Sequence, residues 1–276
     1  MELTQADVDR VVAAALAEDV GDGDRTTAAL VPADAHARAQ LLLEEPGVVC
    51  GVRVAAAVFR AVDPNVRVEA LVDDGDAVTD VPAVLATVEG PARAVLTGER
   101  VALNLLGRLC GIASLTRRYV ELVDGTGATI LDTRKTTPGL RSLEKYAVRC
   151  GGGANHRAGL YDAVLVKENH LRIAGGIPAA VAALNGARDV EIEAETAEQV
   201  QEALDAGVGR ILLDNMSPEQ VAGAVGLVAG RAHLEASGGV SLGTVRAYAE
   251  TGVDFISVGA LTHGARSLHV SLEVLD

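Results

Sequence analysis

The chain has 276 residues, of which 49% are hydrophobic, and it carries a net charge of −14 at pH 7. This hydrophobic content argues against a disordered protein, and the negative charge argues against a nucleic acid or an anionic membrane surface as a partner. The acidic start lacks the pattern of a secretion signal, and no apolar run approaches the roughly 20 residues of a membrane-spanning helix, so we expect a cytoplasmic protein.

The first part of the chain, to about residue 110, is predicted to be an α+β unit. Its early elements are a helix over 8–16, a strand over 37–45, a helix over 55–62 and a strand over 66–72. The stretch 73–98 is punctuated by Gly, Asp and Pro, which predicts short strands and turns. A long helix is predicted over 99–123, where the chain enters its second half.

The second half alternates between short apolar runs and helix-length segments. The predicted strands are 128–133, 163–169, 190–195, 210–215, 233–239 and 254–260. Several of the segments between them begin at residues that favour helix starts, namely Thr196, Ser217 with Pro218, and Ser241. Repeated strand–helix–strand units imply a parallel sheet, and six such strands favour a closed or nearly closed barrel over a doubly wound sheet. No Gly-x-Gly-x-x-Gly motif follows the first strand, which disfavours a dinucleotide-binding fold.

Polar residues or glycines end each predicted strand. They are Asp132 with Arg134 and Lys135; Lys167, Glu168 and Asn169; Glu193 and Glu195; Asp214 and Asn215; Glu235 with Ser237, Gly238 and Gly239; and Gly259. In a parallel barrel the carboxyl ends of the strands converge on one rim, where barrel enzymes hold their active sites. The sequence therefore predicts an active site at this rim.

Three carboxylates lie on one face of a single predicted strand. Glu191, Glu193 and Glu195 are spaced two apart, and strand side chains alternate between faces. Inside a barrel they would repel one another unless a cation or an ammonium group neutralised them. Glu193 and Asp214, on the next strand, form a suitable pair for Mg²⁺ or for sugar hydroxyls.

Basic residues are concentrated beside these acidic ones. Residues 133–172 contain eight Lys or Arg against three acids, and all three lysines of the chain, Lys135, Lys145 and Lys167, lie there. Such a basic wall suits an anionic acceptor with more than one carboxylate. The glycine-containing stretches 236–239 and 258–260 follow the last two strands, which is where barrel enzymes hold phosphate groups.

The three cysteines, Cys50, Cys110 and Cys150, are far apart in the sequence and form no Cys-x-x-Cys pair. We expect buried free thiols in a reducing compartment.

The central block 133–170, TRKTTPGLRSLEKYAVRCGGGANHRAGLYDAVLVKENH, resembles the quinolinate phosphoribosyltransferase family, the carboxylating nicotinate-nucleotide pyrophosphorylases. Segments 18–27 and 98–114 and the motifs VEIE, ILLDN, LEASGG and VGALTH extend the resemblance over essentially the whole chain. It implies an open α/β sandwich domain over 1–110, which the tail 268–276 joins, and an α/β barrel over 111–267 with about six parallel strands. It also implies a homodimer whose active sites are completed by the neighbouring subunit.

The resemblance further implies a reaction of quinolinate with phosphoribosyl pyrophosphate and Mg²⁺, which gives nicotinate mononucleotide, pyrophosphate and CO₂ in NAD biosynthesis. Carried over by position, the acceptor carboxylates would be bound by Arg134, His156, Arg157 and Lys167, and by Arg100 of the partner subunit. Lys135 would face the donor, Glu193 and Asp214 would hold ribose hydroxyls or Mg²⁺, and Ser237, Gly238 and Gly259 would bind phosphate. We expect the chemistry to depend on Lys135, Lys167, Glu193 and Asp214. His263 receives no role.

Three alternatives remain at this stage. A relative from the molybdenum system shares many of the motifs but has an uncertain substrate. A non-decarboxylating nicotinate enzyme is disfavoured by the number of acceptor-side cations, because nicotinate has one carboxylate. A catalytically silent barrel that senses an anionic metabolite would not need Lys135, Glu193 and Asp214 together.

Overall fold

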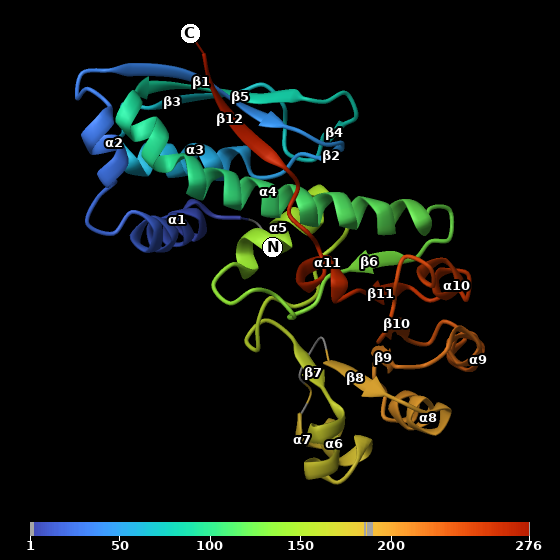
Figure 1. Ribbon diagram of the computed structural model, residues 1–276. Coiled ribbons are helices and arrows are strands. Elements are labelled where there is room, and N and C mark those ends of the chain that lie inside the picture. Colours follow the sequence, from blue (N-terminus) through green and yellow to red (C-terminus); the bar gives the residue numbers. More distant parts are fainter. Residues whose placement is uncertain (1–2, 185, 187–189, 276) are drawn as a thin grey trace. The chain divides into compact units, whose positions relative to one another are not determined.

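The computed structural model describes residues 3–184, 186 and 190–275. The chain forms two compact units, and neither is continuous in sequence (Figure 1). The first, which we call the sandwich unit, comprises Met1–Arg117, Thr136–Gly152 and Leu261–Asp276. The second, the barrel unit, comprises Arg118–Lys135 and Gly153–Ala260. No helix among the described residues has the length and apolar character needed to cross a membrane.

An antiparallel sheet is the centre of the sandwich unit, with its strands in the order β12-β1-β5-β3. Their bounds are β1 His36–Leu43, β3 Arg67–Ala70, β5 Ala83–Pro91 and β12 Val270–Leu275, and a separate short pair consists of β2 Gly47–Val48 and β4 Ala77–Val78. The helices are α1 Gln5–Asp19, α2 Arg25–Leu30, α3 Val52–Val62, α4 Ala92–Leu122, which continues into the barrel unit, α5 Arg141–Cys150 and α11 Ala260–His263. The C-terminal strand β12 pairs with β1, so the end of the chain contributes to this sheet.

The long helix α4 begins seven residues before the predicted start at 99, immediately after β5 ends at Pro91. The prediction of strands and turns up to residue 98 is therefore wrong for its last part. Gly98 explains the error, because a glycine at the end of such a stretch indicates a turn. In the structure it lies within the helix, where a Cβ would come 2.9 Å from a ring carbon of Phe59. Close helix packing, not a turn, requires glycine at this position.

Six parallel strands form the sheet of the barrel unit, in the order β6-β11-β10-β9-β8-β7, which confirms the predicted strand number and direction. The bounds are β6 Thr129–Leu131, β7 Val164–Val166, β8 Val190–Ala194, β9 Arg210–Asp214, β10 His233–Ser237 and β11 Phe255–Ser257. The first and last strands of this order, β6 and β7, are not paired with each other. Ala154 instead forms a parallel bridge with Leu131 of β6. The barrel is therefore open between β6 and β7.

Helices lie along the outside of this curved sheet (Figure 1). They are α6 Glu168–Ala174, α7 Ile177–Ala183, α8 Ala197–Asp205, α9 Pro218–Val228 and α10 Val245–Ala249. The predicted helix starts at Thr196 and Ser217 are confirmed, since their side chains accept from the backbone N–H of Gln199 and Gln220. The third, at Ser241, is wrong, because residues 241–244 form a turn closed by bonds to Thr244 and α10 begins only at Val245.

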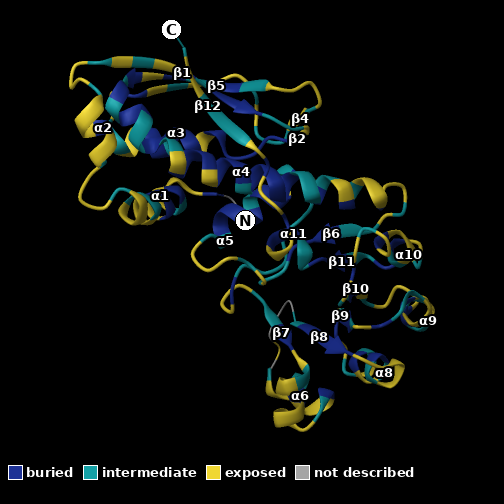
Figure 2. Ribbon diagram, in the orientation of Figure 1, coloured by how far each residue is buried: buried dark blue, intermediate teal, exposed yellow. Residues whose placement is uncertain are grey.

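The strands have one apolar face and one polar face. Ile192, Leu213 and Ala236 are completely buried, and they alternate along their strands with Glu193, Asp214 and Glu235. Figure 2 shows buried residues concentrated on the strands and exposed ones on the outer turns of the helices. The helices therefore cover the apolar face, and the polar face is turned toward the barrel interior.

Candidate active site

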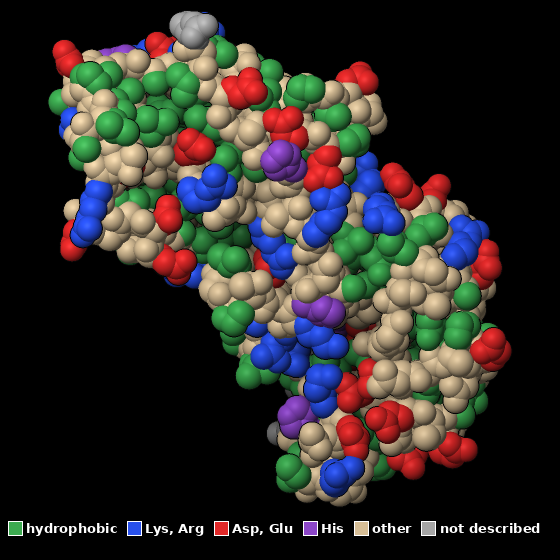
Figure 3. Space-filling view, in the orientation of Figure 1, with side chains coloured by type: hydrophobic (Ala, Val, Ile, Leu, Met, Phe, Trp, Pro, Cys, Tyr) green, Lys and Arg blue, Asp and Glu red, His purple; other side chains and the backbone are tan. Residues whose placement is uncertain are grey.

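The carboxyl ends of four neighbouring strands bring together four predicted site residues. Lys167 directly follows β7, Glu193 is the next-to-last residue of β8, Asp214 ends β9 and Ser237 ends β10. The register pairs Ser237 with Asp214, and the adjacent strands end at the same level. Figure 3 shows basic and acidic side chains close together on the part of the drawn face where β7 and β8 lie. The predicted rim is present.

An ion pair joins two of these residues. The Lys167 Nζ lies 2.6 Å from Oε2 of Glu193, and Oε1 of the same carboxylate accepts from the backbone N–H of Glu168 at 3.2 Å. Glu193 is 7% exposed, whereas half of the Lys167 side chain is accessible. The spacing of Glu191, Glu193 and Glu195 predicts a cation or an ammonium group near them. Lys167 supplies that ammonium group for Glu193. Glu195 lies beyond the end of β8 and is exposed.

Asp214 lies within electrostatic range of this ion pair. Burial and the charge of Glu193 raise the pKa of Asp214, and the ammonium groups of Lys167 and Lys135 act in the opposite direction. Its carboxylate also accepts from the Asn215 side chain at 2.7 Å. Two carboxylates that repel each other at an accessible rim would be stabilised by a divalent cation or by hydroxyl donors. The donor set therefore fits Mg²⁺ or ribose hydroxyls.

Two guanidinium groups lie close together on the segments 133–135 and 155–157. The positive charge of Arg134 adds to the effect of burial in lowering the pKa of Arg157. Arg157 donates to the carbonyl of Ala163 at 3.2 Å, while its buried Nε has no hydrogen-bond partner among the described residues. The repulsion between two adjacent half-buried cations is reduced when an anion is bound between them. The pair is therefore suited to an acceptor with carboxylate groups.

His156 is held in the barrel interior. Its Nε2 lies 3.0 Å from Glu191 Oε2 and 3.4 Å from Glu235 Oε1, and its Nδ1 accepts the backbone N–H of Arg157 at 2.7 Å. A ring whose Nδ1 accepts a hydrogen bond carries its proton on Nε2, which is the atom facing the carboxylates. The backbone N–H of His156 donates to Asp132 at 2.9 Å. The structure thus places this imidazole between two buried carboxylates.

An interior network extends from His156 and was not found from the sequence. Arg210, at the start of β9, donates to Glu191 at 3.0 Å and to Glu235, and Ser257 donates to Glu235 at 2.5 Å. Burial and the neighbouring Glu191 raise the pKa of Glu235. Burial also acts to raise the pKa of Glu191, but its hydrogen bond with His156 and the charge of Arg210 leave it lowered. The period of two along β8 predicts Glu191 on the inner face with a cation beside it, but no signal in the sequence identifies Arg210, at the start of another strand, as that cation.

The remaining predicted residues lie at three places. Gly238 follows β10 with a φ of +98°, and a Cβ there would come 2.2 Å from Oδ1 of Asn215, so only glycine fits. Gly259 lies in the turn that follows β11. Arg100 is exposed on α4 and belongs to the sandwich unit, so it is not among the residues that the barrel strands bring together.

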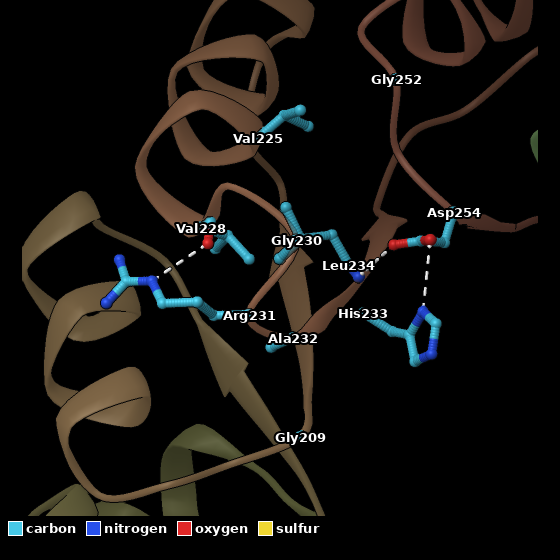
Figure 4. A pocket seen from close by; sticks show the side chains of 10 residues that line it. All are labelled: Gly209, Val225, Val228, Gly230, Arg231, Ala232, His233, Leu234, Gly252 and Asp254. Atoms are coloured by element: carbon cyan, nitrogen blue, oxygen red, sulfur yellow. Dashed lines mark hydrogen bonds and ion pairs between the residues drawn. The ribbon is translucent and has the colours of Figure 1, made fainter.

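Two cavities open at the amino ends of the strands, away from the rim. One, of about 650 Å³, is lined by His156, Arg157, Glu191 and Arg210 among others. The other, of about 420 Å³, lies between the end of α9 and the starts of β10 and β11. In Figure 4 His233 faces Asp254 across the mouth of this second cavity, at 3.2 Å, and none of the predicted site residues lines it.

Comparison with known proteins gives consistent matches over the chain. The description "Quinolinate phosphoribosyl transferase, N-terminal domain" matches residues 24–110, and the corresponding C-terminal domain matches residues 112–273. The probable nicotinate-nucleotide pyrophosphorylase (carboxylating) of Bacillus subtilis is 42% identical over 93% of this chain and 90% of its own length.

Solved structures are similar over their full length. The structure of NadC from Streptococcus pyogenes is 41% identical, covers 100% of both chains and has a TM-score of 0.93. The nicotinate-nucleotide pyrophosphorylase from Francisella tularensis is 40% identical, covers 99% of this chain and 98% of its own, and has a TM-score of 0.94.

Proposed function

Because the chain belongs to the quinolinate phosphoribosyl transferase family, we propose that it transfers the phosphoribosyl group of phosphoribosyl pyrophosphate to quinolinate. The acceptor then loses one carboxylate as CO₂, and the products are nicotinate mononucleotide and pyrophosphate, a step of NAD biosynthesis. The observation that supports this proposal is that one unit contains both kinds of group that the reaction needs. A pair of guanidinium groups, Arg134 and Arg157, and a carboxylate pair with its lysine, Glu193, Asp214 and Lys167, all belong to the barrel unit.

On the acceptor side, Arg134 and Arg157 bind the carboxylates of quinolinate. A guanidinium can hold a carboxylate with two parallel hydrogen bonds, and a bound dianion would offset the repulsion between the two arginines. Lys167 joins them, since half of its side chain is accessible despite its ion pair with Glu193. His156 takes no part in proton transfer: its ring lies between Glu191 and Glu235 and the backbone N–H of Arg157, and so it orients the segment that carries Arg157.

On the donor side, Glu193 and Asp214 bind ribose hydroxyls or Mg²⁺, and Lys135 faces the pyrophosphate. Cleavage of the bond between ribose and pyrophosphate makes the sugar more positive and the leaving group more negative. The two carboxylates stabilise the sugar, and Lys135 stabilises the leaving group. When bound, Mg²⁺ neutralises the departing pyrophosphate further. Ser237, Gly238 and Gly259 hold the phosphate of the ribose at the ends of β10 and β11.

After the pyridine nitrogen attacks the sugar it carries a positive charge, which stabilises the electron pair that the departing CO₂ leaves on the adjacent ring carbon until a proton from water replaces the lost carboxylate. Arg134 and Arg157 keep the acceptor ring in place during this step. The same two residues favour quinolinate over nicotinate, because nicotinate offers one carboxylate to two guanidinium groups. No covalent intermediate with the protein is needed.

We also propose that the protein is a cytoplasmic homodimer with shared active sites. Arg100 supports this part, because it is exposed on α4 and lies outside the barrel unit that contains the other proposed ligands. In a dimer of this kind, Arg100 of one subunit would reach the acceptor site of its partner. Mixing Arg100→Ala protein with Lys167→Ala protein should then restore part of the activity when subunits exchange.

The decisive experiment measures CO₂ and pyrophosphate release from quinolinate and donor, with and without Mg²⁺, and uses nicotinate as the competing acceptor. Arg134→Ala should raise the KM for quinolinate strongly, because a charge-assisted bidentate contact is worth about 2–5 kcal/mol. Arg172→Ala is the matched control, since Arg172 forms an exposed pair with Glu168 on α6. Turnover of nicotinate without release of CO₂ would contradict the proposal, and so would an unchanged KM in Arg134→Ala.

A further inference from the structure

All three cysteines of the chain meet in the sandwich unit, although they are widely separated in sequence. Cys50 precedes α3, Cys110 lies within α4 and Cys150 ends α5. The backbone N–H of Cys50 lies 3.3 Å from Sγ of Cys110, and that thiol lies 3.4 Å from the carbonyl of Cys50. The Sγ atoms of Cys50 and Cys150 and a carboxylate oxygen of Asp74 all lie within 4.8 Å of one another.

The two thiols nearest Asp74 differ in their surroundings. Cys50 and Cys110 are fully buried, as predicted, whereas Cys150 is only half-buried, so the prediction of a buried thiol is wrong there. A hydrogen bond from the Cys50 thiol lowers the pKa of the Cys150 thiol. Burial raises the pKa of Cys50 well above its usual range. An accessible, more acidic thiol next to a protonated one is the arrangement of a reactive cysteine beside the cysteine that resolves it.

We propose that Cys50 and Cys150 form a reversible disulfide when the protein meets a hydroperoxide. The Cys150 thiolate attacks the outer oxygen of the peroxide, the O–O bond breaks, and Cys150 becomes a sulfenic acid while the remaining oxygen leaves as an alcohol or as water. The sulfur of Cys50 then attacks the Cys150 sulfur and loses its proton, and the sulfenic oxygen leaves as water. The two thiols give up two electrons in all, and the peroxide accepts them.

A divalent cation is the alternative occupant of this cluster, and the position of Asp74 disfavours it. One carboxylate oxygen accepts the backbone N–H groups of Gly51 and Val52 at 2.9 and 3.3 Å, and the other accepts the Tyr146 hydroxyl at 2.8 Å. A metal would have to displace these donors and would need a second thiolate at the buried Cys50. A disulfide is neutral and leaves the hydrogen bonds of Asp74 in place.

The test uses the full chain, reduced, freed of reductant and then treated with hydrogen peroxide. After denaturation and alkylation, intact mass should show the loss of two hydrogen atoms and one remaining alkylated thiol, that of Cys110. Peptide mapping should join the Cys50 peptide to the Cys150 peptide, and dithiothreitol should reverse the change. Cys110→Ala is the matched control, which keeps the pair and should still form the link, whereas Cys150→Ser should not.

Several results would overturn the proposal. They are three alkylatable thiols in the treated wild-type protein, a sulfinic acid at Cys150 without a link, and a disulfide that includes Cys110 or joins two chains. Zn²⁺ that survives gel filtration in equal stoichiometry and protects both thiols would assign the cluster to a metal instead. Mapping of the wild-type protein decides between these outcomes even where a variant folds poorly.

Discussion

Replacement of Arg210 by Met tests the interior network of the barrel. In the wild type Arg210 donates to two buried carboxylates, Glu191 at 3.0 Å and Glu235, and its guanidinium stacks 4.4 Å from the centre of the Phe255 ring. Methionine keeps much of the apolar stem but removes the charge. The variant therefore leaves Glu191 and Glu235, which are 5% and 0% exposed, close to each other without the guanidinium, while His156 still contacts both.

The expected loss of stability is large. Removal of one partner from a buried ion pair costs about 3–5 kcal/mol, and loss of an arginine–aromatic contact costs about 0.5–1 kcal/mol. Because 33% of the Arg210 side chain is exposed, water replaces part of the lost interaction. We therefore expect a total of about 3 kcal/mol, which is roughly a hundredfold change in the unfolding equilibrium constant.

The effect should depend on pH. Without the guanidinium, the pKa values of Glu191 and Glu235 in the folded protein rise above their values in the unfolded chain. A carboxyl group with a raised pKa in the folded state binds protons more tightly there, so stability falls as pH rises through that pKa. The deficit of Arg210→Met should therefore be larger at about pH 8 than at about pH 5, where protonation relieves the repulsion.

Urea unfolding at both pH values measures the free energy of unfolding. It is followed by circular dichroism, because the chain contains no tryptophan for a fluorescence measurement. Arg172→Met is the matched control, because Arg172 pairs with Glu168 on the surface with side chains 74% and 46% exposed. It should cost no more than about 0.5 kcal/mol. The reasoning is refuted if Arg210→Met loses less than about 1 kcal/mol and loses it equally at both pH values.

Three further outcomes follow from the rim. Glu193→Gln removes the charge that pairs with Lys167, so kcat/KM should fall at least about a hundredfold. The same change at the exposed Glu202 of α8 should leave kcat/KM unaltered, and equal values of kcat/KM in the two variants would exclude a role for Glu193. Mg²⁺ binding, measured by calorimetry, should weaken as pH falls through the raised pKa of Asp214, and Asp214→Asn should abolish this dependence. Gly238→Ala should destabilise the protein more than Gly239→Ala, because both have positive φ but only the first would bring a Cβ within 2.2 Å of Asn215; thermal melting compares them.

The barrel could be predicted because its sequence signals are local. Short apolar runs, helix-starting residues such as Ser217 and the polar strand ends repeat with a regular spacing, and each signal depends only on neighbouring residues. The same locality explains the failure at Gly98, because its packing against Phe59 depends on a residue elsewhere in the fold. Ser241 carries a cap signal, but Thr244 closes a turn with it and α10 begins only after that turn.

Interactions between distant residues could not be predicted in this way. Nothing near Cys50 or Cys150 indicates that residues 100 positions apart in the sequence lie within one cluster. Arg210 begins its strand, whereas the predicted cations lie at strand ends. Its partners are fixed by strand order, which places β9 between β8 and β10 and so puts Glu191 and Glu235 on either side of it.

Glu191 and Glu193 lie at two depths in the barrel and have different partners. Glu191 and Glu193 share a face of β8, but two residues along a strand are separated by about 7 Å. The upper carboxylate pairs with the accessible Lys167, whereas the lower one contacts Arg210 and His156. The lower level is linked to the backbone, because the His156 ring accepts the N–H of the next residue and so helps to fix the position of Arg157.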